Sequence, residues 1–146
     1  EQVALVRGVE IFEGTILDNV RMGREACDSV RVKEALERAG LLHELEALPD
    51  GLNTKLATGG RPLSGGQAIR LMLARAFAGR PRLLLIDETL DWLDDAEGRD
   101  QALQTVFDPK ASWTLLVATN RPDIAARCGR TVQVVKGGVV ESEGGR

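Results

Sequence analysis

Two short polar groups carry the side chains that could do chemistry. Residues 63–67 read Leu-Ser-Gly-Gly-Gln, and Asp87-Glu88 follow the apolar run 83–86. Adjacent glycines after a good N-cap such as Ser64 let backbone N–H groups approach an anion, and the helix dipole adds to the attraction. One carboxylate can hold Mg²⁺, and its neighbour can orient or deprotonate an attacking water. Each group alone also fits a plainer interpretation, an ordinary helix start or a pair of solvated acids.

Two elements must position these groups. The apolar residues behind Ser64 recur at helical spacing and predict a helix, with Arg70 and Arg75 off its apolar stripe: Ile69, Leu73, Ala76 and Phe77. The run 83–86 follows Pro81, is short and does not alternate, which is typical of a strand buried on both faces of a parallel sheet. Ligands bind at the carboxyl edge of such sheets, where we expect Asp87 and Glu88 to lie.

The rest of the chain alternates strands with helices, which indicates an α/β fold. Thr15 is expected to cap a short helix, and Asn120 is expected at the end of a second buried strand. We predict strands over 2–6 and 113–119, helices over 28–39, 41–48, 97–107 and 122–128, and a hairpin of 131–136 with 139–143.

Composition sets broad limits on the function. The chain has 146 residues, 43% of them hydrophobic and 28% charged, which suits a single globular domain. The net charge of −3 gives no support for a nucleic-acid partner. Cys27 and Cys128 lie far apart without metal-ligand spacing, and no apolar run approaches the roughly 20 residues of a membrane helix.

Together these residues resemble the ATP-binding-cassette (ABC) ATPases. Residues 63–67 match the LSGGQ signature in full, 83–88 look like the Walker B strand with its catalytic glutamate, and 91–94 stand where the family has its SALD-type D-loop. Residues 12–20 resemble the F-x-GTI-x-x-N stretch of ABC exporters. The resemblance implies a P-loop NTPase (RecA-like) fold, with an α-helical subdomain over residues 15–80 and parts of a mostly parallel core sheet over 1–14 and 81–146.

The resemblance also implies roles for individual residues. Asp87 would hold Mg²⁺, Glu88 would act as general base on ATP bound in its own chain, and Asp94 would link two ATP sites. The signature residues would instead contact the γ-phosphate of ATP bound to a partner domain: Ser64, Gly65, Gly66 and Gln67. Two positions depart from the family pattern, because Arg7 stands near the place of the Q-loop glutamine and Asn120 at that of the switch histidine.

No G-x-x-x-x-G-K-[ST] phosphate loop occurs in these residues. The chain therefore resembles the carboxyl-terminal portion of a nucleotide-binding domain, incomplete at its N-terminus. Without the family's Walker A strand, the strands at 115–119 and 131–135 should lack a shared neighbour and leave Val and Leu side chains exposed. The expected partners are a second ABC ATPase domain in a head-to-tail dimer and a transmembrane permease domain, fused upstream.

The function that the resemblance implies is ATP binding and hydrolysis for an ABC exporter at the cytoplasmic face of the cell (inner) membrane. One alternative is a hydrolysis-poor, nucleotide-gated ABC half that acts as a regulatory interaction module. Arg7 and Asn120 favour this alternative because they replace groups that sense the γ-phosphate, whereas Glu88 and the intact signature argue against it. A second alternative, a soluble ABC ATPase of DNA repair or translation, is disfavoured by the exporter-like segment 12–20.

Overall fold

The computed structural model describes residues 2–93 and 98–142, and a parallel sheet runs through the middle of the chain. Strands β1 (Val3–Arg7), β4 (Leu83–Asp87) and β5 (Thr114–Ala118) are hydrogen-bonded in the order β1-β4-β5. Both pairings are parallel and in register, so the three carboxyl ends lie at one edge of the sheet. The predicted α/β class with a parallel sheet is confirmed.

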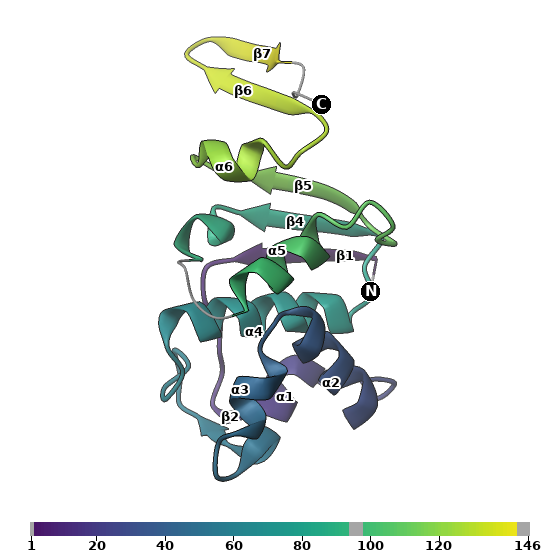
Figure 1. Cartoon of the computed structure of the whole chain (residues 1–146), viewed down its shortest axis with the longest axis vertical. Coiled ribbons are helices and arrows are strands. Elements are labelled where there is room, and N and C mark those ends of the chain that lie inside the picture. Colours follow the sequence, from purple (N-terminus) through teal and green to yellow (C-terminus); the bar gives the residue numbers. More distant parts are fainter. Residues whose placement is uncertain (1, 94–97, 143–146) are drawn as a thin grey trace.

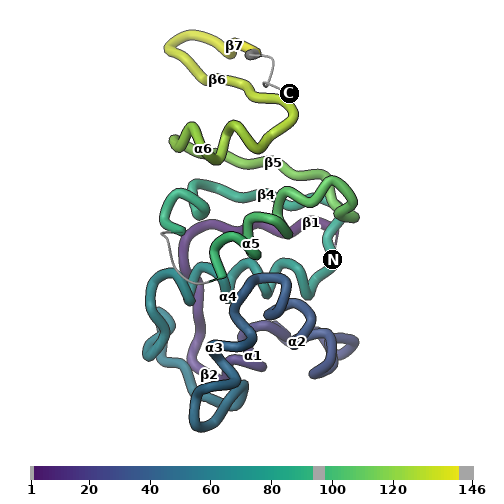
Figure 2. Tube along the Cα trace, viewed as in Figure 1, coloured from purple at the N-terminus to yellow at the C-terminus, as the bar shows by residue number. Residues whose placement is uncertain are grey.

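The longest described helix, α4, lies between strand β1 and helices α1 and α2 (Figures 1 and 2). It begins within the Leu-Ser-Gly-Gly-Gln group and is buried over most of its length. The helices are α1 (Ile16–Arg21), α2 (Ser29–Arg38), α3 (Leu42–Glu46), α4 (Gly65–Ala78), α5 (Arg99–Val106) and α6 (Pro122–Ala125), with short 3₁₀ turns η1 (Gly51–Asn53) and η2 (Thr89–Trp92).

The predicted starts of α1 and α2 are confirmed by capping hydrogen bonds. Thr15 forms a capping box with Asp18 at the start of α1, and Asp28 accepts the Arg31 N–H at the start of α2. Hydrogen bonds from Thr15 lower the pKa of Asp18, because they stabilise its carboxylate. These local bonds satisfy N–H groups that have no partner within the helix, which is why the sequence predicts them well.

One continuous hydrophobic core joins the sheet to α4 and α5. Phe77 of α4 stacks on Trp113 with ring centroids 5.4 Å apart, and the Arg38 guanidinium lies over both rings. Arg70 is only 1% exposed although it lies off the apolar stripe of α4. The stripe therefore underestimated how much of this helix the sheet and the other helices enclose.

The prediction that the strand at 83–86 is buried on both faces is wrong. Leu84 and Ile86 are buried on the face toward the helices. On the other face Leu85 is flanked in register by Leu5 and Leu116, which are 62% and 63% exposed. The physical reason is that the described helices cover one face of the sheet, so only alternate residues of β4 reach the core.

Strand β5 was also predicted to be buried, and it is instead the edge of the parallel sheet. Strands β6 (Thr131–Val135) and β7 (Gly138–Ser142) form the predicted hairpin as a separate two-stranded sheet. Within residues 2–93 and 98–142 no strand joins β5 to β6, and Val134 is 82% exposed. This confirms the expectation that these strands lack a shared neighbour and expose Val and Leu side chains.

A third small sheet was not predicted. Strands β2 (Gly14–Thr15) and β3 (Lys55–Leu56) pair antiparallel and tie the start of α1 to the segment that leads to α4. In the part of the chain that the structure describes, no helix is long and apolar enough to cross a membrane. The division into a helical subdomain over 15–80 and core-sheet parts over 1–14 and 81–146 stays a prediction.

Candidate functional site

The carboxyl edge of the parallel sheet brings together four of the predicted site residues. Arg7 and Asp87 are register partners at the ends of β1 and β4, and the Arg7 Nε lies 3.4 Å from Asp87 Oδ2. Glu88 follows Asp87 directly, and the Asn120 amide donates a hydrogen bond of 3.0 Å to Glu88 Oε1. Both carboxylates are accessible to solvent, with the Asp87 side chain 45% exposed. The edge thus presents two acids, one cation and one amide to a ligand.

Glu88 reaches this position through an uncommon backbone conformation. Its φ of 53° lies in the left-handed region, which costs a non-glycine residue about 1–2 kcal/mol. Its N–H still bonds the Ala118 carbonyl at 2.9 Å, so the turn remains attached to β5. Below it the hydroxyl of Thr89, only 2% exposed, accepts the Gly8 N–H at 3.2 Å and lies 3.1 Å from the Val6 carbonyl. The turn is therefore built from bonds to both neighbouring strands.

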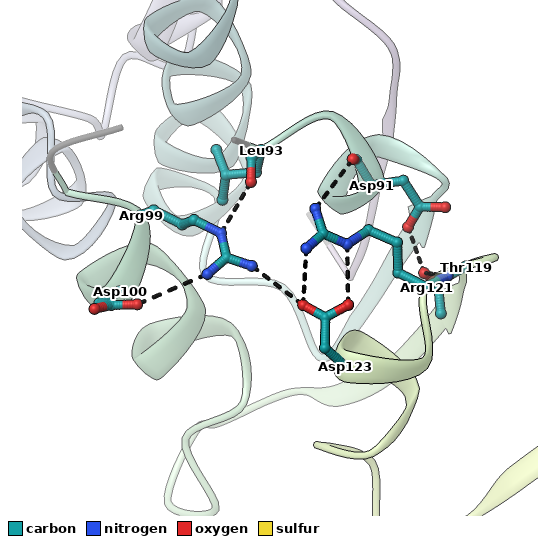
Figure 3. Close-up of polar contacts among 7 residues, drawn as sticks. All are labelled: Asp91, Leu93, Arg99, Asp100, Thr119, Arg121 and Asp123. Carbon is teal, nitrogen blue, oxygen red and sulfur yellow. Dashed lines mark hydrogen bonds and ion pairs between the residues drawn. The ribbon is translucent and has the colours of Figure 1, made fainter. Parts of the chain in front are cut away.

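A second set of polar contacts includes Asp91, Thr119, Arg121 and Asp123 (Figure 3). The Asp91 carboxylate accepts hydrogen bonds from the Thr119 hydroxyl and, at 2.9 Å, from the Asn120 N–H. Sequence reasoning placed Asp91 in the D-loop but gave it no role. Its immediate sequence carries no signal for this contact. The available pointer was that Asp91 follows β4 and Asn120 follows β5, two neighbouring parallel strands that end at the same edge.

Two arginines complete this set. Arg121 donates to both oxygens of Asp123 at 3.0 and 2.9 Å, and Arg99 reaches Asp123 at 3.3 Å. The hydrogen bonds from Arg121 are the main reason why the pKa of Asp123 lies below its ordinary value. Arg99 also donates to the Leu93 carbonyl at 2.9 Å, so the contacts join η2, α5 and α6.

The signature group forms the start of α4, where its side chains cap the helix. The Gln67 N–H bonds the Ser64 hydroxyl at 3.2 Å, and the Gln67 side-chain oxygen accepts the Ser64 N–H at 2.9 Å. A Cβ built on Gly65 would meet no atom within 4 Å, and the recorded bonds of the described residues leave the Gly65 and Gly66 N–H groups without an acceptor. These open N–H groups at a helix N-terminus suit an anionic ligand.

The Gln67 side chain also reaches a buried ion pair. Its amide donates to Glu44 Oε2 at 2.6 Å, while Arg70 donates to Glu44 Oε1 and to the Gly40 carbonyl, both at 2.5 Å. Desolvation alone raises the pKa of Glu44, but the hydrogen bonds from Arg70 and Gln67 and the Arg70 charge outweigh it and lower the pKa. Gly98 passes so close that a Cβ there would lie 2.3 Å from the Arg70 guanidinium. Sequence reasoning missed this network.

The two groups singled out in the sequence are not joined in the structure. Among the described residues no hydrogen bond or ion pair links Ser64 to Gln67 with Asp87, Glu88 or Asn120. Asp94, predicted to link two ATP sites, lies outside the described residues. The chain thus carries two separate surfaces that suit a phosphate-bearing ligand.

The acids at the sheet edge could supply only part of a Mg²⁺ site. The described residues contain no group of three or more His, Cys, Asp or Glu that could hold a metal by themselves. Mg²⁺ is commonly bound by one or two carboxylates together with substrate phosphates and water, and an accessible aspartate at a strand end fits that pattern. Asp87 therefore suits Mg²⁺ when a phosphate ligand is present.

Comparisons with known proteins show to which family the chain is similar. A family model described as ABC transporter matches residues 3–91, more than half of the chain. The ABC-type transporter fsqE of Aspergillus fumigatus is 46% identical over 113 residues, which cover 74% of this chain and 9% of the relative. An ATP-dependent lipid A-core flippase of Desulfotalea psychrophila is 34% identical over 143 residues, which cover 96% of this chain and 24% of the flippase.

The fold has a solved counterpart. A structure of a bacterial Atm1-family ABC exporter with ATP bound is similar with a TM-score of 0.79 and 26% identity, over 89% of this chain and 23% of that chain. This similarity identifies the α/β core as a P-loop NTPase fold. The chain spans at most about a quarter of the length of these proteins. From the extent of the family match, the chain belongs to the ABC transporter family.

Proposed function

We propose that this chain is part of the ATP-binding and ATP-hydrolysing domain of an ABC exporter. The observation that carries the proposal is the hydrogen bond of 3.0 Å from the Asn120 amide to Glu88. It holds an accessible carboxylate beside Asp87 at the carboxyl edge of a parallel sheet, where such folds bind ligands. The similarity to the lipid A-core flippase and to the ATP-bound exporter supports transport as the purpose of the hydrolysis.

In this proposal Glu88 is the general base and Asp87 the metal ligand. Asp87 would hold Mg²⁺, which supplies charge neutralisation on the phosphates of ATP. Glu88 would take the proton from the attacking water, and its accessible carboxylate leaves room for one. Asn120 would orient Glu88 and can offer its second amide hydrogen to the γ-phosphate.

The start of α4 would serve a different nucleotide. From the resemblance of residues 63–67 to the family signature we infer that Ser64, Gly65, Gly66 and Gln67 contact ATP bound to a second ABC ATPase domain, and among the described residues they share no bond with the acids of their own chain. The open N–H groups of Gly65 and Gly66 would face its γ-phosphate. The proposed assembly is a head-to-tail dimer joined to a transmembrane permease domain, fused upstream, at the cytoplasmic face of the inner membrane.

One observation favours a second candidate, a nucleotide-gated regulatory module with little hydrolysis. Arg7 Nε lies 3.4 Å from Asp87 Oδ2, so the cation occupies an oxygen that Mg²⁺ would otherwise use. The pair is largely exposed, with the Arg7 side chain 74% accessible, and exposed pairs contribute only about 0–1 kcal/mol. Mg²⁺ with ATP can therefore displace Arg7, and we retain hydrolysis as the proposal.

Glu88→Gln in the full-length protein tests the general base. The amide keeps the size of Glu88 but cannot take a proton, so ATP should still bind while steady-state turnover falls by about a hundredfold or more. Asp100→Asn, at a side chain 84% exposed on α5, is the matched control and should keep wild-type turnover. Unchanged hydrolysis in Glu88→Gln would contradict the general-base role, and negligible hydrolysis in the wild type would favour the regulatory module.

A further inference from the structure

We propose that Asp91 is a positioning residue, which holds residues 119–121 so that the Asn120 amide orients the Glu88 carboxylate. The inference rests on the proposed function, because it names a further residue that acts on the same base. The backbone N–H of Asp91 bonds the Glu88 carbonyl at 3.0 Å, but among the described residues its carboxylate bonds neither Asp87 nor Glu88. The carboxylate acts on Glu88 through the segment that carries Asn120.

The contacts of the Asp91 carboxylate account for this role. Oδ1 accepts the Thr119 hydroxyl and Oδ2 accepts the Asn120 N–H at 2.9 Å. The Thr119 oxygen in turn accepts the Arg121 N–H at 3.0 Å. One carboxylate therefore fixes three consecutive residues just after β5 ends. A side chain with two acceptor oxygens and no donor suits two converging donors.

The turn that carries Asp91 is itself held in place. Leu90 and Leu93, on either side of it, are both fully buried. The Leu93 carbonyl accepts from Arg99 at 2.9 Å, and the Asp91 carbonyl lies 3.5 Å from Arg121 Nη1. Figure 3 shows both of these contacts, from Arg99 to the Leu93 carbonyl and from Arg121 to the Asp91 carbonyl. Asp91 thus acts from a fixed turn on Thr119 and Asn120, while Arg121 is also held by its two hydrogen bonds to Asp123.

Asn120 and Glu88 depend on that segment. Both side chains are exposed, so packing does not hold them in place. In the part of the chain that the structure describes, the Asn120 amide is the side-chain partner recorded for the Glu88 carboxylate. When the Asn120 backbone is free to rotate, its amide leaves Glu88, and the base loses its orientation toward a water. A base that is misdirected lowers the rate of the chemical step without weakening ATP binding.

The experiment compares Asp91→Ala with Asp91→Asn in the full-length protein, with Asp100→Ala as control. Asp100 is another acid of the same region, but its recorded contact is with Arg99 at 3.9 Å and not with residues 119–121. In Asp91→Ala, hydrogen–deuterium exchange of residues 119–121 should be about tenfold faster, as expected for a lost hydrogen bond to a carboxylate. The kcat for ATP should fall by about tenfold while KM stays within about twofold.

The conservative variant separates positioning from charge. Asn at position 91 keeps an oxygen for the Asn120 N–H and can donate its amide to the Thr119 oxygen. Asp91→Asn should therefore keep exchange and kcat within about threefold of the wild type, and so should Asp100→Ala.

Three results would overturn the inference: unchanged exchange in Asp91→Ala, faster exchange with unchanged kcat, or a loss confined to KM. The proposed function fails in a different way, as an absence of turnover in the wild-type protein. The exchange comparison still decides in that case whether Asp91 holds residues 119–121, because it does not depend on hydrolysis.

Discussion

The ion pair of Arg70 and Glu44 leads to a quantitative prediction about the stability of α4. Arg70 is 1% exposed, and among the described residues its charge is balanced by the Glu44 carboxylate, whose side chain is 19% exposed. Glu44→Ala removes that carboxylate and leaves a buried guanidinium with the Gly40 carbonyl as its recorded acceptor. We expect this variant to destabilise α4 strongly.

The magnitude follows from the burial of the two partners. Removing one member of a buried ion pair costs roughly 3–5 kcal/mol. Because Glu44 is partly exposed, water can replace some of its contact with Arg70, and we therefore expect a cost of about 3 kcal/mol. Glu44→Gln should cost about half of that, since its oxygen can still accept from Arg70 while its amide faces the Gln67 amide. The double variant Glu44→Leu/Arg70→Met should be more stable than Glu44→Ala, because no unpaired charge remains.

Hydrogen–deuterium exchange of the α4 amides in the full-length protein measures this cost. A loss of about 3 kcal/mol corresponds to roughly a hundredfold faster exchange through local opening. Glu46→Ala is the matched control, because Glu46 lies on α3 together with Glu44. Its ion pair with Lys33 at 2.9 Å is about half exposed on both sides and contributes about 0–1 kcal/mol. Exchange in Glu44→Ala within about threefold of the control, or a double variant less stable than Glu44→Ala, would refute the reasoning.

Three further predictions concern the site, the pH dependence and the chain by itself. Asn120→His should raise kcat by about tenfold, because an imidazolium adds a charged donor beside the γ-phosphate; equal or lower turnover in a steady-state assay would show that the site is adapted to asparagine. Because the folded pKa of Glu44 lies below its ordinary value of 4.5, its contribution to stability should be complete above that pH and lost as the pH falls through the folded pKa; thermal melts of wild type and Glu44→Gln should therefore converge in acid. The 146-residue chain expressed alone should aggregate, because Leu5, Leu116 and Val134 are exposed on edge strands, and it should bind no ATP measurably, because its sequence contains no phosphate loop; light scattering and nucleotide titration test this, and a soluble ATP-binding monomer would contradict it.

Local chemistry was readable from the sequence because it acts over a few residues. Thr15 and Ser64 cap the helices that they were predicted to cap, and each forms a capping box with the residue three positions later. Asn120 follows the strand that was predicted before it. The parallel arrangement then brings Asp87, Glu88 and Asn120 to one edge, as strand order and the α/β pattern indicate.

The tertiary structure alone decided which side chains share an environment. The apolar stripe of α4 says nothing about Arg70, whose burial depends on the close passage of Gly40 and Gly98 from distant segments. The one-sided burial of β4 depends on which face of the sheet the helices cover. A short apolar run in the sequence looks the same whether one face of its strand is covered or both are.

The same limit applies to the site itself. Asp91 is a polar residue in a turn, and nothing in its immediate sequence shows that two donors from the end of β5 converge on its carboxylate. Hydrogen bonds between residues far apart in sequence depend on chain geometry that spacing does not encode. The sequence by itself therefore determined the family, the helix caps and the acids at the strand end, while tertiary packing decided how those acids are held.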